Sequence, residues 1–143
     1  KGDIVAKRDD SPLPGDHNTQ NILAALAVIS TFNPDWQQIR KTLKTFQGVE
    51  HRIEKVTEIN GIPYYNDSKS TNLDSLKVAL ESFEGNILLI AGGQGKGGDY
   101  SMLSDTIKQR VKQIIAIGTD ADLMCKAWAT NTQTRTTHKK KQY

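Results

Sequence analysis

The chain has 143 residues, of which 36% are hydrophobic and 24% are charged, a usage that is ordinary for globular proteins and sufficient for about one domain. The formal net charge is +3, but three lysines crowd at the end of the chain (residues 139–141), so a basic nucleic-acid-binding face is not expected. The single cysteine, Cys125, excludes an internal disulfide framework.

No apolar run approaches the ~20 residues that a membrane span requires. The first residues, 1–5, lack the apolar segment of a signal peptide. The lone cysteine also fits a reducing compartment. We therefore expect a cytoplasmic protein with neither a nucleic acid nor a membrane as partner.

Two helices are predicted in the first third of the chain. The first runs over residues 19–30, with Asp16 or Asn18 as its cap, and its apolar face is broad enough to be largely buried. The second begins at residues 33–35 and ends near Phe46, with apolar positions at helical spacing.

After residue 50 the apolar period changes to two. Residues 53–65 predict an antiparallel hairpin around the turn Asn60-Gly61. Helices and strands then alternate: a helix over 73–83, a strand over 86–91, a helix over 100–110, a strand over 111–118 and a helix over 121–128. This order predicts an α/β fold with a Rossmann-like, mostly parallel sheet, helices on both of its faces and the hairpin at its start.

The chain changes character near residue 47, which predicts a domain boundary. Two helices without a strand bury too little surface to stand as a domain, so residues 1–47 are expected to be the end of a domain, and residues 48–129 an α/β domain. Residues 130–143 contain almost nothing apolar, and we expect them to be disordered or non-native.

The first candidate site lies at the start of the first helix. Asn18 and Asn21 are three residues apart, so their amides lie on one side of the helix, where they could recognise a purine edge. The alternative is a capped helix with polar residues in its first turn. His17 has no partner at metal-ligand spacing and is not read as a metal site.

The second candidate site is the polar turn that follows the hairpin, residues 66–72. Asp67 could accept from ribose hydroxyls, Lys69 could neutralise a phosphate, and Thr71 and Asn72 could donate either to a ligand or to the next helix. A helix cap is the alternative for Thr71 and Asn72. It does not account for Lys69, a cation close to a helix amino end, where the dipole favours an anion.

The third candidate site is the glycine-rich segment over residues 91–99. Its five glycines and Lys96 would let backbone amides and an ammonium approach an anion closely. The spacing is not that of a P-loop, because Lys96 is followed by Gly97. A flexible turn with a solvated lysine is the alternative. Asp67 and Lys96 both follow strands, so a parallel arrangement would bring them to one edge of the sheet.

These motifs, in this order, resemble the Mur ligase family, and within it the ligases that add D-glutamate. The resemblance covers roughly residues 12–128 and includes His51-Arg52 and the string Asn-Asp-Ser-Lys-x-Thr-Asn that begins at Asn66. This string is its specific part, because family members that add other amino acids generally carry a different one after the strand.

The resemblance implies that residues 1–47 are the end of the family's central, ATP-binding domain, and that residues 48–129 are its C-terminal domain without the last strands. Such an incomplete sheet has an open edge, through which the fragment is expected to self-associate. The resemblance also implies roles for residues on both sides of the cleft between these domains. On the nucleotide side, it implies that Asn18 and Asn21 contact the adenine end of ATP, and that Arg52 and Asp67 contact its phosphate and ribose portions.

On the substrate side, the resemblance implies that Thr71, Asn72 and Lys96 hold D-glutamate. Lys96 and Lys69 are the catalytic residues that we expect in this chain. The family reaction begins when ATP phosphorylates the terminal carboxylate of UDP-N-acetylmuramoyl-L-alanine. The amine of D-glutamate then attacks the acyl phosphate, and phosphate leaves.

Other features of the family are missing from these residues, namely the P-loop, the carboxylates that bind Mg²⁺ and the UDP-sugar domain. We therefore expect no metal ligand in this chain, with Mg²⁺ held mostly elsewhere, and a parent ligase that is a monomer. We expect the chain to be part of a ligase and inactive alone. Two alternatives stay open, a non-catalytic nucleotide- or anion-binding module and a Mur-type ligase for another amino acid.

Overall fold

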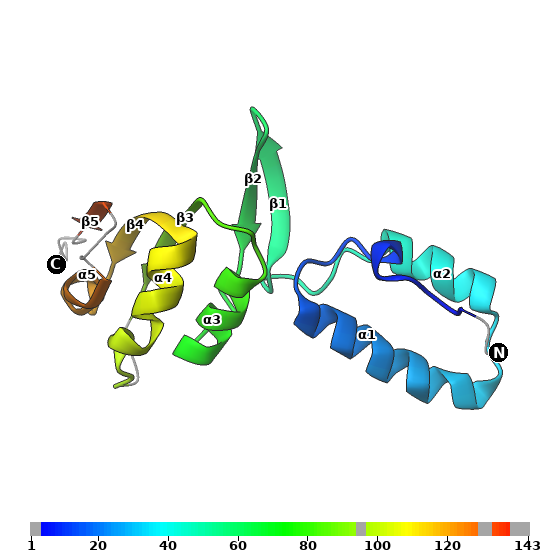
Figure 1. The fold of residues 1–143 in the computed structure, drawn as a ribbon. Helices are drawn as coiled ribbons and strands as arrows, with labels where there is room; N and C mark the ends of the chain where they lie inside the picture. Colours follow the sequence, from blue (N-terminus) through cyan, green and yellow to red (C-terminus); the bar gives the residue numbers. More distant parts are fainter. Residues whose placement is uncertain (1–3, 94–96, 129–132, 138–143) are drawn as a thin grey trace, which may run out of the picture. The chain divides into compact units, whose positions relative to one another are not determined.

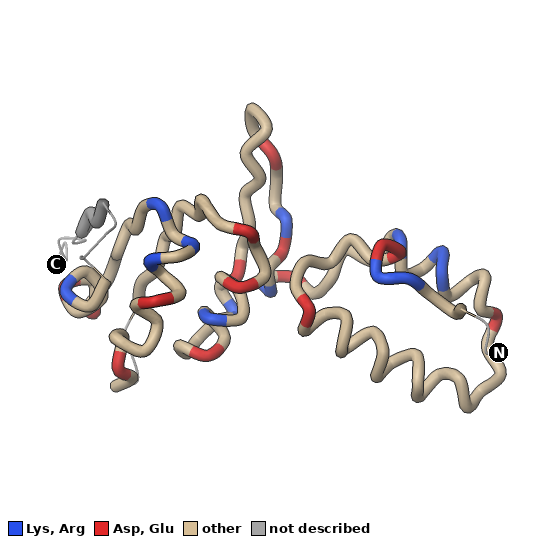
Figure 2. The backbone as a smooth tube through the Cα atoms, viewed as in Figure 1, with Lys and Arg blue, Asp and Glu red and all other residues tan. Residues whose placement is uncertain are grey.

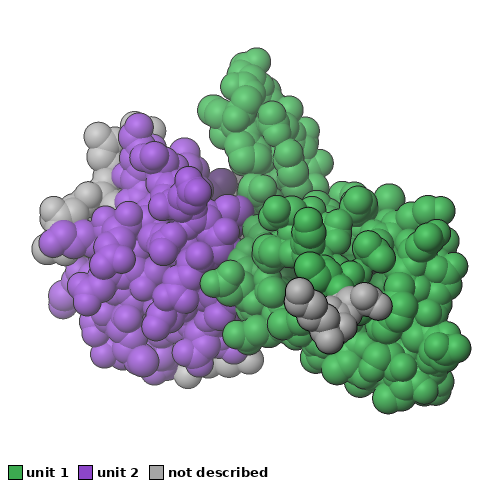
Figure 3. Space-filling model, turned by 45° about the vertical axis from the view of Figure 1, so that its right-hand side comes forward, with its two compact units in different colours: residues 1–69 green, residues 70–143 purple. Residues whose placement is uncertain are grey.

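A computed structural model of the chain describes residues 4–93, 97–128 and 133–137. The chain divides into two compact units, Lys1–Lys69 and Ser70–Tyr143 (Figure 3). Acidic and basic residues are interspersed along the described parts of both units (Figure 2).

The first unit begins with helices, η1 (Arg8–Asp10), α1 (Asp16–Ile29), η2 (Ser30–Phe32) and α2 (Trp36–Thr45) (Figure 1). Helix α2 follows the predicted start at residues 33–35, and Asp35 caps it by accepting from the N–H groups of Gln37 and Gln38. Helix α1 begins three residues earlier than predicted. Its N-cap is Gly15, with φ at 84° and no side-chain cap, so the prediction that Asp16 or Asn18 caps it is wrong.

Helix α1 contains no buried residue, contrary to the expectation of a largely buried face. Ile22 and Leu26 line a hollow together with Leu43 of α2, but Leu23 and Val28 are exposed. The helix carries apolar residues on more than one side, and in the described structure only one of these sides has a packing partner. Its sequence therefore predicted the helix correctly but not how much of it is covered.

The hairpin consists of β1 (Glu54–Ile59) and β2 (Ile62–Asn66), which pair antiparallel as predicted. Asn60 and Gly61 have φ of 51° and 76°, and a two-residue turn with positive φ at both positions matches the twist of the strands it joins. The hairpin forms a sheet of its own. It is therefore not the first part of the parallel sheet, as the sequence led us to expect.

The second unit is an α/β arrangement built around three parallel strands. In chain order it contains α3 (Leu73–Glu81), β3 (Ile87–Gly92), η3 (Tyr100–Leu103), α4 (Ser104–Arg110), β4 (Val111–Ile117), α5 (Ala121–Trp128) and β5 (Gln133–Thr137). The strand order is β3-β4-β5, and both neighbouring pairs are parallel. The predicted α/β class, with its parallel sheet and antiparallel hairpin, is confirmed.

Strand β5 lies in the tail that we expected to be disordered or non-native, and residues 133–137 form a strand there. The strand pairs with β4 from Gln113↔Gln133 to Ile117↔Thr137. The composition argument considered only apolar burial, whereas an edge strand also gains backbone hydrogen bonds to the free side of its neighbour, and threonine favours extended backbone. Residues 130–132 and 138–143, the rest of that expectation, lie outside the described residues.

One face of the parallel sheet packs against the helices. Ile114 and Ala116 of β4 are completely buried there, and the core residues that surround them come from α3, η3, α4 and α5: Leu80, Leu103, Ile107, Ala121, Met124 and Trp128. The opposite face carries Leu88 and Ile90 of β3, which are 56% and 64% exposed. Because side chains alternate along a strand, the described helices cover one face only, where the sequence predicted both.

The covered and the exposed face of the parallel sheet predict different losses of stability when isoleucine is replaced by alanine. We expect Ile114→Ala to lower the free energy of unfolding by about 2 to 5 kcal/mol, because it leaves a cavity in the core. Ile90→Ala is the control on the exposed face and should cost less than about 1 kcal/mol. Chemical denaturation of both variants tests this; equal losses would contradict the assignment of the core face.

Candidate functional site

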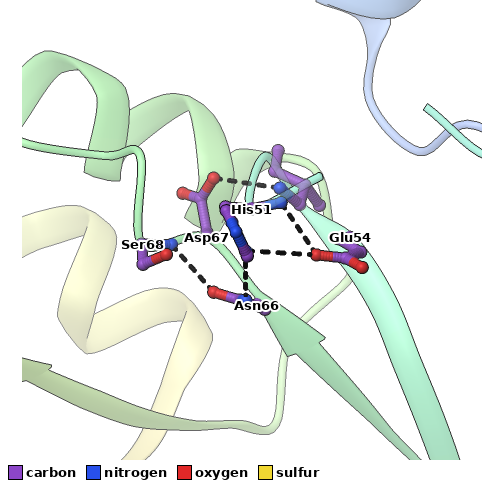
Figure 4. A network of polar contacts seen from close by, with 6 residues as sticks. His51, Glu54, Asn66, Asp67 and Ser68 are labelled. Carbon is purple, nitrogen blue, oxygen red and sulfur yellow. Dashed lines mark hydrogen bonds and ion pairs between the residues drawn. The ribbon is translucent and has the colours of Figure 1, made fainter. Parts of the chain in front are cut away.

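The polar turn after strand β2 is bonded to the segment that precedes strand β1 (Figure 4). The carboxylate of Asp67 accepts a hydrogen bond from the N–H of Ile53, with 3.0 Å between Oδ1 and N. These residues are fourteen positions apart in sequence, and the hairpin brings them together. We call the two bonded segments, residues 51–54 and 66–69, the clasp.

The first segment of the clasp has a backbone that L-residues rarely adopt. The angle φ is 66° at His51 and 46° at Ile53, which strains a β-branched side chain such as that of Ile53. The His51 N–H donates to Glu54 Oε2 at 2.8 Å, and the Lys69 N–H donates to the His51 carbonyl at 3.0 Å. Strain of this kind persists only where surrounding bonds impose it, and the clasp supplies them.

Arg52 lies between the two strained residues. Its N–H donates to the carbonyl of Val49 at 3.2 Å, so the backbone from which its side chain extends is fixed. Arg52 and Lys69 are both exposed, and in the part of the chain that the structure describes neither cationic group has a hydrogen-bond or ion-pair partner. The clasp therefore offers two available positive charges on a rigid backbone.

Asn18 and Asn21 lie in the first turns of α1, as the sequence predicts. The Asn18 amide donates to the carbonyl of Pro14 at 2.7 Å, so its Nδ2 is used locally and its Oδ1 is the group that could accept from a ligand. Asn21 is exposed. Nothing in the geometry tests their expected contact with adenine.

Asn72 caps helix α3. Its Oδ1 accepts from the Ser75 N–H at 2.8 Å, and the Ser75 hydroxyl lies 3.4 Å from the Asn72 N–H, which together form a capping box. The alternative reading of Asn72 as a cap therefore describes this residue in the structure. Thr71 is exposed beside it, and its expected contact with D-glutamate is not tested.

The glycine-rich segment begins where β3 and β4 approach closely. A Cβ on Gly92 would lie 2.3 Å from the carbonyl oxygen of Ile117, and a Cβ on Gly118 would lie 3.0 Å from the Gly93 nitrogen. Only glycine fits such an approach, so these glycines are needed for packing as well as for any ligand. Lys96 lies outside the described residues, together with Gln94 and Gly95.

Tyr100 and Trp128 anchor the segment that follows this loop, and the sequence analysis did not single them out. The Tyr100 hydroxyl donates to Asp120 Oδ2 at 2.8 Å, and Trp128 Nε1 donates to the Tyr100 carbonyl at 2.8 Å. The two rings also form a T-shaped pair with centroids 5.5 Å apart. The N–H of Asp120 donates to the Gly93 carbonyl at 3.3 Å, so both ends of the loop are tied to the end of β4. Two polar-tipped aromatics in an otherwise aliphatic core were the available signal.

Among the described residues, no three His, Cys, Asp or Glu side chains gather at a site that could hold a metal ion. No helix in these ranges is long and apolar enough to cross a membrane.

Comparison with known proteins assigns the chain to a family. The profile of the glutamate ligase domain of Mur ligases matches residues 51–142. The chain belongs to the Mur ligase family. The match includes the whole clasp and also the tail, which the sequence analysis had not related to anything known.

Curated relatives of this Mur ligase chain carry the name UDP-N-acetylmuramoylalanine–D-glutamate ligase. The protein from Caldicellulosiruptor saccharolyticus is 48% identical over 118 residues, which are 82% of this chain and 26% of that protein. The protein from Nitrosomonas europaea is 41% identical over 86% of this chain and 26% of its own length. The chain thus spans about a quarter of the length of these relatives.

Solved structures share the fold at low identity. UDP-N-acetylmuramate-alanine ligase from Thermotoga maritima superposes with a TM-score of 0.72 over 90% of this chain and 31% of its own, at 15% identity. MurF from Acinetobacter baumannii gives a TM-score of 0.59 over 88% and 29%, at 22% identity. These likenesses establish the Mur ligase fold.

The bond between Asp67 and Ile53 predicts that two substitutions of Asp67 differ in how much they lower the free energy of unfolding. Asp67→Ala leaves the N–H of Ile53 without its acceptor, and since Ile53 is 7% exposed we expect a loss of about 1 to 3 kcal/mol in the free energy of unfolding. Asp67→Asn keeps an acceptor oxygen and should lose less than half as much. Urea denaturation measures both; an equal loss would show that the bond to Ile53 does not matter.

The raised pKa of Tyr100 predicts that the folded chain loses stability at alkaline pH. Burial and the hydrogen bond to Asp120 raise the pKa of Tyr100 to about 12 from its ordinary value of 10.0, so the folded chain holds this proton more tightly than the unfolded chain. The stabilisation is complete below pH 10 and is lost as the pH rises toward 12. Thermal unfolding between pH 8 and pH 11 should show a smaller decline for Tyr100→Phe than for the wild type. Tyr64→Phe, which removes an exposed hydroxyl, should decline like the wild type.

Proposed function

We propose that this chain is part of a ligase that joins D-glutamate to UDP-N-acetylmuramoyl-L-alanine at the expense of ATP, in the synthesis of a peptidoglycan precursor. The observation that carries the proposal is the clasp, which fixes the backbone around Arg52 and leaves two cationic groups without partners in the described structure. It belongs to a chain whose relatives are named for this reaction. Cationic groups on a hydrogen-bonded backbone are suited to phosphoryl and acyl transfer, in which negative charge develops on oxygen.

The residues of the chain would act by binding and by stabilising charge. Arg52 and Lys69 would neutralise phosphate oxygens as ATP phosphorylates the substrate carboxylate, and again as the amine of D-glutamate displaces phosphate from the acyl phosphate. In this proposal Asp67 has a positional role through its bond to Ile53, in addition to any contact with ribose.

The remaining assignments follow the resemblance. Asn18 and Asn21 would contact adenine, and Thr71, Asn72 and Lys96 would hold the D-glutamate carboxylates, with Lys96 also catalytic. For Asn72 this requires the nitrogen of its amide, because the oxygen caps helix α3.

Mg²⁺ would supply further neutralisation of the phosphates when bound. The described residues do not gather a set of ligands for it, so no step is assigned to it here. A cytoplasmic location and a monomeric parent remain predictions from the sequence, as does self-association of the fragment.

The test uses the full-length parent enzyme. Arg52→Ala and Lys69→Ala should each lower kcat/KM for D-glutamate-dependent phosphate release about 100-fold or more, because each removes charge stabilisation. Lys77→Ala is the control, since Lys77 is paired with Glu81 on the surface of α3. The 143-residue chain alone should release no phosphate. Preference of the parent for another amino acid, or phosphate release that does not depend on the UDP-sugar, would contradict the proposal.

A further inference from the structure

The imidazole ring of His51 in the clasp has two polar neighbours at one of its nitrogens (Figure 4). Its Nδ1 lies 2.9 Å from Asn66 Nδ2 and 3.5 Å from Glu54 Oε2. These two neighbours favour different tautomers of the ring. An amide nitrogen can only donate, so it requires a bare Nδ1, whereas a carboxylate can only accept, so it requires an Nδ1 that carries hydrogen.

The orientation of the Asn66 amide is fixed from its other end. Its Oδ1 accepts from the N–H of Ser68 at 3.1 Å, and a backbone N–H cannot serve an amide nitrogen in this way. Rotating the amide by 180° would therefore lose this bond. The Nδ2 group faces His51 because Ser68 holds the oxygen.

Glu54 competes weakly for the same ring nitrogen. Its Oε2 already accepts from the His51 backbone N–H at 2.8 Å, while its separation of 3.5 Å from Nδ1 is at the limit of a hydrogen bond. The shorter contact with Asn66 therefore decides which nitrogen of the neutral ring carries the hydrogen. Since a neutral imidazole has one donor and one acceptor, the hydrogen is on Nε2.

The Nε2–H group is available to a ligand. The side chain of His51 is 52% exposed, and Nε2 has no partner among the described residues. The ring is also held in place, because Glu54 and Lys69 fix the backbone of His51 on both sides. Arg52, the cation expected to meet phosphate, is the next residue.

We propose that Asn66 is a positioning residue, which places the hydrogen of the neutral form of His51 on Nε2 and so keeps Nε2 a hydrogen-bond donor to an anionic oxygen beside Arg52. The identity of that oxygen, on phosphate or carboxylate, rests on the proposed function; the state of the ring does not. An uncharged donor of this kind polarises an oxygen without adding a further full charge to those of Arg52 and Lys69.

The first experiment observes the ring directly. In the chain labelled with ¹⁵N at its three histidines, the nitrogen shifts and their couplings to the ring carbon-bound protons distinguish the two neutral tautomers. His51→Gln identifies the signals of His51, and spectra are taken at a pH where these no longer change. We expect the Nε2–H form in the wild type. The Nδ1–H form, or an equal mixture, would overturn the proposal.

Asn66→Asp tests the cause. The new carboxylate still accepts from the Ser68 N–H but offers His51 an acceptor in place of a donor, so the hydrogen should move to Nδ1. Asn60→Asp makes the same chemical change in the hairpin turn, where φ is 51° and aspartate is tolerated, and should leave the Nε2–H form unchanged. An unchanged tautomer in Asn66→Asp would refute the role of Asn66.

Kinetics of the full-length ligase test the donor role. Asn66→Asp should lower kcat/KM about 10-fold to 100-fold, the usual effect of disturbing a residue that orients a site, while Asn60→Asp should stay within about twofold of the wild type. Wild-type kinetics in Asn66→Asp would overturn the donor role. A parent that does not ligate D-glutamate would instead refute the proposed function, and the tautomer result would still stand.

Discussion

The bond between the Asp67 carboxylate and the N–H of Ile53 is the constraint on which the candidate site depends. It joins the end of strand β2 to the strained segment before β1. Without this bond, nothing would compensate for the strain of the left-handed backbone at Ile53. Because Arg52 lies inside that segment, its position is a consequence of the bond. The side chain that the sequence marked as a ligand contact thus also holds the scaffold.

The clasp places a hydrogen-bond donor and two cations on one hydrogen-bonded backbone. His51 contributes a directed hydrogen-bond donor, while Arg52 and Lys69 contribute charge. Such groups stabilise a developing oxyanion best when they are fixed before the reaction begins, because no reorganisation is then required. The strain at His51 and Ile53 is consistent with this use, since strained backbone is retained where function requires a particular geometry.

In the second unit, close glycine contacts and the hydrogen bonds of Asp120 fix the two ends of the glycine-rich loop, at Gly93 and Tyr100. The close approach of Gly92 to Ile117 and of Gly118 to Gly93 brings the ends of β3 and β4 together, and Asp120 bonds to both Gly93 and Tyr100. The segment that contains Lys96 therefore starts and ends at anchored residues. Packing around Trp128 supports this anchor, so the core of the sheet and the ends of the loop are parts of one structure.

The sequence by itself determined the elements, because their signals are local. The Asn60-Gly61 turn required a hairpin, Asp35 set the start of α2, and the apolar run before Gly92 required a strand. It also marked Asp67, Lys69 and Thr71 as candidate ligand contacts, since no plain turn needs that combination of side chains.

Only the tertiary structure decided what those side chains contact. The pairing of Asp67 with Ile53 and of Asn66 with His51 depends on the register of the hairpin, which brings residues about fifteen positions apart into hydrogen-bond range. Likewise, the exposed face of β3 and the added strand β5 depend on which surfaces meet. Local patterns specify backbone conformation, whereas burial and hydrogen-bond partners arise from contacts between distant segments, and no single stretch of sequence contains both sides of such a contact.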